Sequence, residues 1–464
     1  MKVYRVRIFC CALVLLFTFS QARADRVDDY VRARMGERHV PGLALAVVRD
    51  GKPVKVRGYG LADVELNVPV GTETVFEIGS VTKQFTAAAV MMLVEEGKVG
   101  LDDRIAKYLP PVPPAWESVT VRQLLTHTSG IKNYTGLSGF ELEKHLTKEQ
   151  FIKAVSGYPL DFAPGEKWSY SNTGFNLLGM IVEKASGQSY WDFMRARVFG
   201  PLGMTATTDR NPRLVIPNRA AGYEWRRDHL EHRDTDFTDL FSAGAIVSTI
   251  TDMVKWDAAL NGERLLKRSS LETLWTPAKL NKGESYPYGL GWFIESVRGH
   301  RVIRHSGSTS GFSSSITRYP DDRLSVIVLC NLGTEGVAGR ISQGVARMYV
   351  PALSLNSLQP ASDDDARSSA LLRDALAQLL QGRPDPALYA PERRAALSSD
   401  ATKATLRRLA SYGALSSFTF IRQDAEGRKR SRLYRVSLGD HTVFLKFVLD
   451  GEAKVSDFTV EEEN

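Results

Sequence analysis

The chain has little cysteine and no recognisable metal-binding pattern. Of its three cysteines, Cys10 and Cys11 lie near the N-terminus, which leaves Cys330 as the only thiol of the remaining chain. A single thiol forms no intrachain disulfide, so a disulfide-stapled scaffold is excluded there. The eight histidines include neither H-x-H-x-D nor H-E-x-x-H, and His229 and His232 are expected in a polar loop. Metal-dependent hydrolysis is therefore disfavoured, and no metal or other cofactor is expected.

A dense basic surface is also missing. Lysine and arginine form no stripe with interleaved aromatic residues, and the run Arg428–Arg432 is expected to be a solvated hairpin turn. With 43% hydrophobic and 24% charged residues, the composition is that of an ordinary globular protein. We therefore expect no nucleic-acid partner.

The one long apolar run lies at the start of the chain. Lys2, Arg5 and Arg7 precede Ile8–Phe19, and the small-residue sequence Ala22-Arg-Ala24 follows. This order is typical of a secretory signal peptide, and the run is too short to span a membrane. We expect residues 1–24 to be removed, which would lower the formal net charge from +7 to +3. The mature protein is then expected to be periplasmic or secreted, without a stable membrane anchor.

The hydrophobic pattern predicts an α+β domain over residues 25–352. A short helix at Val27–Met35 is expected first. Strand-like runs occur both early and late in this segment, at Leu43–Arg49, Val54–Tyr59, Gly289–Ile294, Arg301–His305, Phe312–Arg318 and Leu324–Leu329. The section between them has mostly helical periodicity, as in Thr251–Leu260. This arrangement favours one sheet that joins the two ends of the domain.

A second, smaller domain is expected at the C-terminus. Residues 353–369 are rich in Ser, Asp, Pro and Asn and are predicted to be a linker. Residues 370–464 then show helical patterns followed by strand-like runs, at Leu371–Leu380, Glu392–Ala410, Ser417–Arg422, Arg432–Leu438, Thr442–Leu449 and Lys454–Val460. This small α+β accessory domain either shapes the substrate range or packs elsewhere.

The stretch Ser80-Val-Thr-Lys83 places a hydroxyl group and an amine three residues apart at the expected start of a helix. From Phe85 the apolar residues recur at helical spacing, and the helix is expected to end near Gly97. Ser80 and Lys83 therefore share a face. A serine hydroxyl needs a neighbouring base, and a buried lysine with a lowered pKa supplies a neutral amine.

An isolated S-x-x-K is a weak signal, because Ser129-Gly-Ile-Lys132 has the same spacing. Two later stretches add partners for Ser80. Tyr170-Ser-Asn172 follows a turn and opens a helix, so its phenol and amide can face one cavity. The third stretch, His305-Ser-Gly307-Ser308, ends a strand, and the N–H groups of Ser80 and Ser308 are expected to form an oxyanion hole.

This ordered trio resembles the serine β-lactamase-like superfamily, in its branch of class C-type β-lactamases, penicillin-binding proteins, D-aminopeptidases and esterases. The likeness spans about Asp25–Val350, and three further stretches support it: residues 124–130, 164–174 and 242–249. The resemblance implies an antiparallel sheet flanked by helices with an all-helical subdomain. It also implies that Ser129 and Lys132 are structural.

By this resemblance, Ser80 is the acylated nucleophile, Lys83 its activator and Tyr170 the general acid/base. Asn172, His305, Gly307 and Ser308 would bind substrate. Either Lys83 or Tyr170 can be the acylation base, because their titrations would be coupled.

The third motif departs from the family pattern, since β-lactamases and transpeptidases carry a lysine where this chain has His305. A neutral imidazole holds a substrate carboxylate less well than an ammonium group does. We therefore expect an esterase or D-amino acid peptidase acting on a small-molecule or peptide ester or amide. The alternatives are a β-lactamase or penicillin-binding protein, and a non-catalytic envelope binding protein on the same fold. The sequence leaves the oligomeric state open.

Overall fold

The structure is a computed structural model that describes residues 25–109, 111–137, 146–233, 240–426 and 429–461. The expected signal segment lies outside these residues, as does part of the basic run Arg428–Arg432. Within the described ranges, no helix combines the length and the apolar character that crossing a membrane requires.

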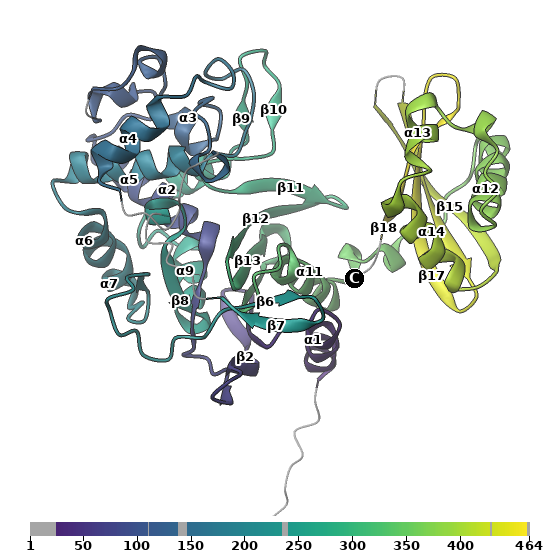
Figure 1. Ribbon diagram of the computed structural model, residues 1–464, viewed down its shortest axis with the longest axis horizontal. Coiled ribbons are helices and arrows are strands. Elements are labelled where there is room, and N and C mark those ends of the chain that lie inside the picture. The colour runs from purple at the N-terminus through teal and green to yellow at the C-terminus, as the bar shows by residue number, and fades with distance from the viewer. Residues whose placement is uncertain (1–24, 110, 138–145, 234–239, 427–428, 462–464) are drawn as a thin grey trace, which may run out of the picture.

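A seven-stranded antiparallel sheet forms the centre of the larger domain (Figure 1). Its strands, in spatial order, are β11 (Phe293–Val297), β12 (His300–Thr309), β13 (Phe312–Tyr319), β14 (Leu324–Cys330), β1 (Gly42–Arg49), β2 (Lys52–Asp63) and β3 (Val68–Pro69). β1 pairs with β14 along its length, from Leu43 opposite Cys330 to Arg49 opposite Leu324. This pairing confirms the prediction that one sheet joins the two ends of the domain. The predicted strand at Gly289 begins only at Phe293, because Gly291 adopts a positive φ of 78°.

The two faces of β1 pack against different layers. Leu43, Leu45 and Val47 contribute to a core shared with helices α1 (Arg26–Glu37) and α11 (Val337–Tyr349). The small residues Ala44 and Ala46 face the opposite core, which contains helix α2 (Thr82–Glu95). Because β1 is buried on both faces, its sequence is a continuous apolar run rather than an alternating one.

The section between the two parts of the sheet is mainly helical and lies to the left in Figure 1. Its helices are α3 (Val121–Leu125), α4 (Lys148–Ser156), α5 (Asn172–Ser186), α6 (Tyr190–Met194), α7 (Gly200–Leu202), α8 (Phe241–Gly244), α9 (Ile250–Leu260) and α10 (Arg268–Leu274). A three-stranded sheet of β4 (Val75–Glu77), β8 (Ile246–Thr249) and β5 (Thr208–Asp209) is inserted among them. A short pair, β9 (Ala278–Lys279) and β10 (Ser285–Tyr286), lies beside them.

The expectation of a loop at His229–His232 is wrong. These residues form strand β7, which pairs with β6 (Tyr223–Arg226) in a hairpin. Arg227 and Asp228, the two turn residues, both have positive φ angles of 47° and 70°. Such a two-residue turn matches the twist of the flanking strands, so the hairpin forms without a glycine.

The C-terminal part forms a second sheet with its own core, at the right of Figure 1. The antiparallel order is β15 (Leu415–Glu426), β16 (Lys429–Leu438), β17 (His441–Leu449) and β18 (Val455–Glu461). Helices α12 (Ala366–Leu380), α13 (Pro391–Ala396) and α14 (Asp400–Ser411) accompany it. The single helix expected over Glu392–Ala410 is interrupted, because Ser399 caps a new helix by accepting a hydrogen bond from the Thr402 N–H.

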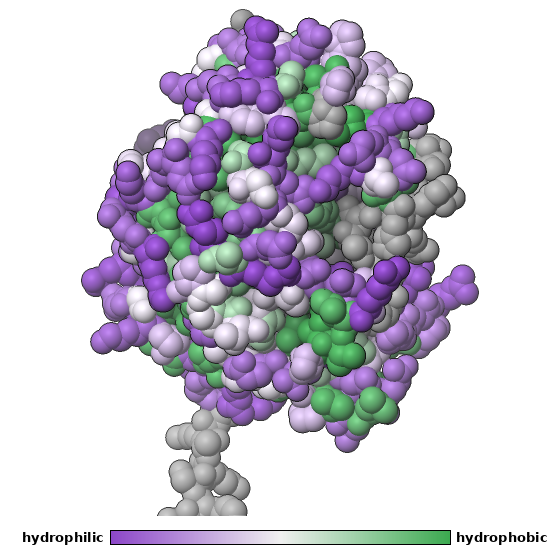
Figure 2. Space-filling view, turned by 90° about the vertical axis from the view of Figure 1, so that its left-hand side faces the viewer, coloured by the Kyte–Doolittle hydropathy of each residue, from purple (hydrophilic) through white to green (hydrophobic). Residues whose placement is uncertain are grey.

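These observations confirm the predicted fold class: an antiparallel sheet flanked by helices, a helical subdomain and a small C-terminal α+β unit. The helical subdomain additionally contains the short strands described above. Hydrophilic side chains cover most of the face shown in Figure 2, and the hydrophobic ones there form only small clusters.

Candidate active site

Ser80 lies in a tight 3₁₀ turn, Gly79–Val81, that leads directly into α2. Two hydrogen bonds from neighbouring elements fix the residue before this turn. The Ile78 N–H donates to the Ile246 carbonyl at 3.1 Å, and the Ser314 hydroxyl donates to the Ile78 carbonyl at 2.7 Å. Glu77, the last residue of β4, is held by a buried ion pair with Arg210. The backbone leading to Ser80, the candidate nucleophile, is therefore held by contacts with three other segments of the chain.

Lys83 is completely buried at the first turn of α2. Its Nζ lies 3.1 Å from Ser80 Oγ, 2.8 Å from Asn172 Oδ1 and 2.8 Å from the Ala243 carbonyl oxygen. Burial lowers the pKa of Lys83 well below its ordinary value. The structure thus brings together the two residues whose spacing suggested a nucleophile and its base.

The contacts of Lys83 suit a neutral amine. The Asn172 amide oxygen and the Ala243 carbonyl oxygen can only accept hydrogen bonds, so they take the two N–H groups of the amine. The lone pair is then directed at Ser80 Oγ, whose proton it can receive. An ammonium group would instead have to donate to all three oxygens, at the cost of a buried charge.

Tyr170 lies just before α5 and is half-buried, and it is not among the described residues that line the cavity in front of Ser80. Its ring lies between two groups: Lys83 Nζ is 4.7 Å from the ring centroid, and the His127 ring centroid is 4.3 Å away. Burial raises the pKa of Tyr170, and a hydrogen bond with Ser80 opposes part of that rise. The phenol is therefore protonated at neutral pH and contacts the nucleophile.

Asn172 is the first residue of α5, with Ser171 as the N-cap. Besides accepting from Lys83, its Nδ2 donates to the Thr135 hydroxyl at 3.3 Å, and its backbone N–H donates to Asn133 Oδ1 at 3.0 Å. These contacts fix which end of the Asn172 amide faces Lys83. Asn133 and Thr135 were not identified from the sequence, because neither belongs to a recognisable motif.

The predicted oxyanion residues come together across β12 and the Ser80 turn. Gly307 lies so close to this turn that a Cβ on it would clash with the Ile78 carbonyl and approach Ser80 N to 2.9 Å. Gly79, at a φ of 50°, is equally close to the backbone of Ser308. Glycine is therefore required at both positions. Ser80 and Ser308 both line the same cavity.

His305 lies on β12 behind Tyr170, with 6.3 Å between the ring centroids. Only 2% of its surface is exposed, and it is not among the described residues that line the cavity. Burial, together with the nearby Lys83, lowers the pKa of His305 to about 3. The motif predicts a substrate contact at His305, whereas the structure places a neutral imidazole in the layer behind the phenol.

A buried chain of hydrogen bonds connects His305 to His127 through Tyr288. The Ser171 N–H donates to His127 Nδ1 at 3.1 Å, so in the neutral ring the proton is on Nε2. His127 Nε2 then donates to the Tyr288 oxygen at 3.2 Å, and the Tyr288 hydroxyl donates to His305 Nε2 at 3.0 Å. His305 Nδ1 completes the chain by donating to the Ser306 carbonyl at 2.7 Å.

The direction of this chain is fixed by the backbone groups at its two ends. Burial lowers the pKa of His127 well below its ordinary value and raises that of Tyr288, so all three side chains are neutral. The layer behind Tyr170 therefore carries no positive charge that would lower the pKa of the phenol. His127 belongs to a stretch singled out in the sequence, but only the structure connects it to the site.

The cavity in front of Ser80 has a volume of about 360 Å³. The helical subdomain contributes Thr135, Asn172, Leu240 and Ala243 to its lining, and the sheet side contributes Glu224, Ser308 and Thr309. No described lining residue comes from the C-terminal sheet or its helices. The described part of the chain also holds no group of three or more His, Cys, Asp or Glu side chains arranged for a metal ion.

The second S-x-x-K stretch has none of these features. The Lys132 ammonium forms an ion pair with Asp161 near the surface, and the Ser129 hydroxyl accepts a hydrogen bond from the Ile131 N–H at 3.2 Å. Neither side chain lines the cavity in front of Ser80. This pair therefore has a structural role.

The sequence model of the Beta-lactamase family matches residues 27–345 of the chain, which include every site residue described above. The chain belongs to the Beta-lactamase family. Members of this family are generally serine hydrolases, so the fold and the family agree on the general class of chemistry.

Two sequence relatives and two solved structures place the chain within the Beta-lactamase family. Penicillin-binding protein 4* of Bacillus subtilis is 33% identical over 318 residues, which cover 64% of this chain and 69% of that protein. Protein flp of Staphylococcus aureus is 29% identical over 322 residues, covering 68% of this chain and 64% of flp. The chain thus spans less than two thirds of flp.

Among solved structures, the octameric penicillin-binding protein homologue from Pyrococcus abyssi is 25% identical with a TM-score of 0.61. The match covers 91% of this chain and 96% of that one, so it extends into the C-terminal part. The D-stereospecific amidohydrolase from Streptomyces sp. is 28% identical with a TM-score of 0.58, covering 68% of this chain and 97% of that one. This Beta-lactamase family member is therefore similar both to penicillin-binding proteins and to an amidohydrolase.

Proposed function

We propose that the protein is an exported serine hydrolase that cleaves an ester or amide through an acyl-enzyme on Ser80. The observation that carries this proposal is the environment of Lys83. Its amine is fully buried, its two N–H groups have carbonyl-type acceptors, and its lone pair is left to face Ser80 Oγ at 3.1 Å.

Acylation begins when Lys83 Nζ takes the proton of Ser80 Oγ, which attacks the substrate carbonyl carbon. The carbonyl π bond opens onto its oxygen, and the N–H groups of Ser80 and Ser308 stabilise the resulting oxyanion. As the tetrahedral intermediate collapses, Tyr170 gives its proton to the departing oxygen or nitrogen, and Lys83 returns a proton to Tyr170. The products of this step are the acyl-enzyme, the protonated leaving group and an uncharged Lys83–Tyr170 pair.

Deacylation repeats the sequence with water as the nucleophile. The Lys83–Tyr170 pair accepts a proton from the water, and the resulting oxygen attacks the acyl carbonyl carbon. Collapse of the second intermediate breaks the bond to Ser80 Oγ, which recovers its proton from the pair. Lys83 acts as the base and Tyr170 as the acid in this scheme, because burial shifts their pKa values in opposite directions.

The proposed substrate class is an ester or a D-amino acid amide. His305 is neutral and buried where penicillin-recognising relatives are expected to carry a lysine, so one attraction for a substrate carboxylate is missing. The similarity to a D-stereospecific amidohydrolase also supports a D-amino acid amide as the substrate.

The second candidate is a penicillin-binding protein or β-lactamase, and the names of the Bacillus subtilis and Pyrococcus abyssi relatives favour it. Acylation of Ser80 by penicillin with slow or no release would support binding. Rapid release of penicilloate would support a β-lactamase.

Intact-mass spectrometry tests the proposal directly. The full mature chain is incubated with an activated ester, with a penicillin and with a D-amino acid p-nitroanilide, and the Ser80→Ala variant is treated in parallel. The expected result is a transient acyl adduct on the wild type with the ester or the D-amino acid substrate, and none on the variant. An adduct that persists in Ser80→Ala would show that another residue is the nucleophile. The absence of both adduct and turnover with every probe would favour a binding protein.

A further inference from the structure

A second cavity of about 360 Å³ lies near the ends of strands β1, β13 and β14 that are away from Ser80. Strand β13 connects the two sites: the Ser314 hydroxyl donates to the carbonyl of Ile78, two residues before Ser80, and Arg318 lies four residues further along the strand. At the rise of an extended strand this separation is roughly 13 Å. The second cavity shares no lining residue with the first.

The guanidinium group of Arg318 lines this cavity, and only some of its N–H groups have hydrogen-bond acceptors. Arg318 is 4% exposed; its Nε donates to Asp257 at 2.8 Å and its Nη2 donates to Asn261. Its Nη1 is buried and has no hydrogen-bond partner among the described residues. Burying a donor without an acceptor is unfavourable, so such groups generally have a partner in the working protein.

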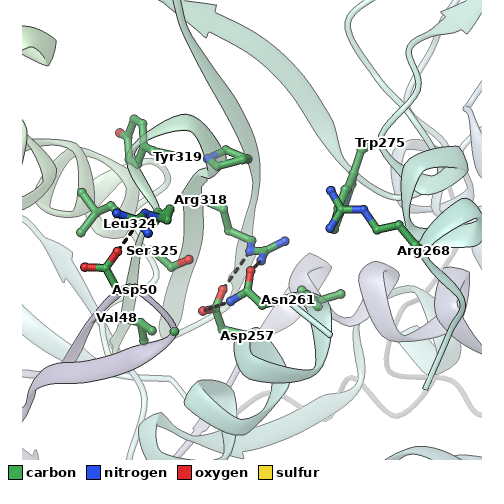
Figure 3. Close-up of a pocket in the computed structure, with 14 residues that line it drawn as sticks. Val48, Asp50, Asp257, Asn261, Arg268, Trp275, Arg318, Tyr319, Leu324 and Ser325 are labelled. Carbon is green, nitrogen blue, oxygen red and sulfur yellow. Dashed lines mark hydrogen bonds and ion pairs between the residues drawn. The ribbon is translucent and has the colours of Figure 1, made fainter. Parts of the chain in front are cut away.

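A second unpartnered donor lies beside the first. The indole Nε1 of Trp275 is buried without an acceptor, and the Arg318 guanidinium carbon lies 5.1 Å from the Trp275 ring centroid. In Figure 3 the free side of the Arg318 guanidinium is directed toward Trp275 and Arg268. Two residues that line the cavity thus each carry a buried N–H group without a hydrogen-bond acceptor among the described residues.

The charged side chains that line the cavity are compatible with a bound anion. Asp257 is already paired with Arg318, and Asp50 with Arg323 at 2.9 Å. The Arg268 side chain also lines the cavity, and its ion-pair partner Glu272 does not. Asp257 offsets the charge of Arg318 and Glu272 that of Arg268, and an anion between the two guanidinium groups would be attracted to both. Arginine is the residue best suited to hold such a group through paired hydrogen bonds.

We propose that this cavity binds a small organic oxyanion, a carboxylate or a phosphate monoester, attached to an apolar body. The anionic group accepts hydrogen bonds from Arg318 Nη1 and Trp275 Nε1 and pairs with Arg268. The apolar body packs on Leu260 and the Trp275 ring, which line the same cavity. This site is independent of the chemistry proposed for Ser80.

Isothermal titration calorimetry on the full mature chain tests this proposal, with benzoate, phenyl phosphate and inorganic phosphate as probes and benzamide as the neutral control. The Ser80→Ala background prevents turnover at the other cavity. We expect saturable binding of benzoate or phenyl phosphate and none of benzamide. The tighter of the two identifies the anionic group. Equal affinity for phenyl phosphate and inorganic phosphate would overturn the role of the apolar body.

The variants leave the buried Arg318–Asp257 ion pair intact, because its removal could unfold the protein. Arg268→Gln is expected to weaken binding about fivefold, since an exposed charged contact is worth about 1 kcal/mol. Trp275→Phe keeps the ring and removes one donor, so a similar loss is expected. Arg195→Gln removes another exposed helical arginine, which pairs with Asp192 and Asp209 outside this cavity, and should leave binding unchanged. Equal losses in Arg268→Gln and Arg195→Gln, or no saturable binding of either aromatic anion, would overturn the site.

Discussion

Two stretches of this chain have the same Ser-x-x-Lys spacing and different surroundings. Lys83 is completely buried, and its Nζ contacts Ser80, Asn172 and Ala243. The Lys132 side chain is 30% exposed, and its ammonium group pairs with a carboxylate. Spacing brings a hydroxyl group and an amine near one another, but only burial makes the amine neutral and leaves its lone pair for the serine. The predictions below test this difference.

Removing each hydroxyl in turn should give the largest contrast. Ser80→Ala is expected to abolish acyl-adduct formation and lower kcat by about 10⁴-fold or more, because it removes the oxygen that is proposed to form the acyl bond. Ser129→Ala removes only an acceptor for one backbone N–H and should keep nearly full activity. Adduct mass and initial rates measure both, and a large loss in Ser129→Ala alone would reverse the assignment of the two stretches.

Substitutions of the two lysines should differ in their effect on kcat almost as strongly as substitutions of the two serines. Lys83→Met removes the base that receives the Ser80 proton, so kcat should fall about 10²- to 10⁴-fold. Lys132→Met should change kcat less than about twofold, because its partner Asp161 lies outside the cavity lining. Circular dichroism on both variants checks that the fold is intact. Comparable activity in the two variants would show that burial of Lys83 has no catalytic role.

The dependence of kcat/KM on pH tests the neutral state of Lys83. The base must be deprotonated, so activity should be lost as pH falls through the lowered pKa of Lys83, at a pH well below the ordinary lysine value of about 10.4. The acid must be protonated, and burial raises the pKa of Tyr170, so activity should persist to high pH. An acid limb centred near the ordinary lysine pKa would refute the neutral amine.

A smaller effect is expected from the layer behind Tyr170. Tyr288→Phe removes the hydroxyl that joins His127 to His305, which leaves two buried imidazole nitrogens without a partner. We expect a loss of about 1–3 kcal/mol in the free energy of unfolding, with a drop in kcat of about tenfold or less. Tyr286→Phe is the matched control, since Tyr286 is half-buried and only stacks on Trp168. A pH–rate profile that is identical in wild type and Tyr288→Phe would show that the hydrogen bonds joining His127, Tyr288 and His305 have only a structural role.

The smallest effect is expected from the ion pair of the second stretch. Asp161→Asn should lower the free energy of unfolding by at most about 1 kcal/mol, because the pair with Lys132 is partly exposed and screened by salt. Urea denaturation at low and high salt measures this. A loss above about 3 kcal/mol would show that the pair is energetically a buried one.

The same comparison explains how far the sequence could predict the site. Ser80, Lys83, Tyr170 and Asn172 were found because the chemistry needs those residue types at fixed short spacings. Ala243 was not assigned a role, because its contribution is a backbone carbonyl that any residue could supply. Tyr288 was not identified, since a phenol that hydrogen-bonds to two histidines far away in the sequence leaves no local pattern.

The secondary structure was likewise predicted where the sequence has a local pattern and missed where it has none. The alternating and continuous apolar runs predicted β1, β2 and β12–β14, because those strands are long and at least partly buried. The β6–β7 hairpin was missed, since its strands are short and polar, and its turn is made by Arg227 and Asp228 rather than by glycine.

The sequence by itself determined the α+β class and the positions of the candidate reacting groups, because periodicity and motif spacing are local properties of the chain. The tertiary structure decided which of two identical spacings is buried, and that His305 lies behind the phenol rather than in the cavity wall. It also decided that Arg318 keeps a free donor in a second cavity. These outcomes depend on which distant segments exclude water from a given side chain, and that information is present only in the folded molecule.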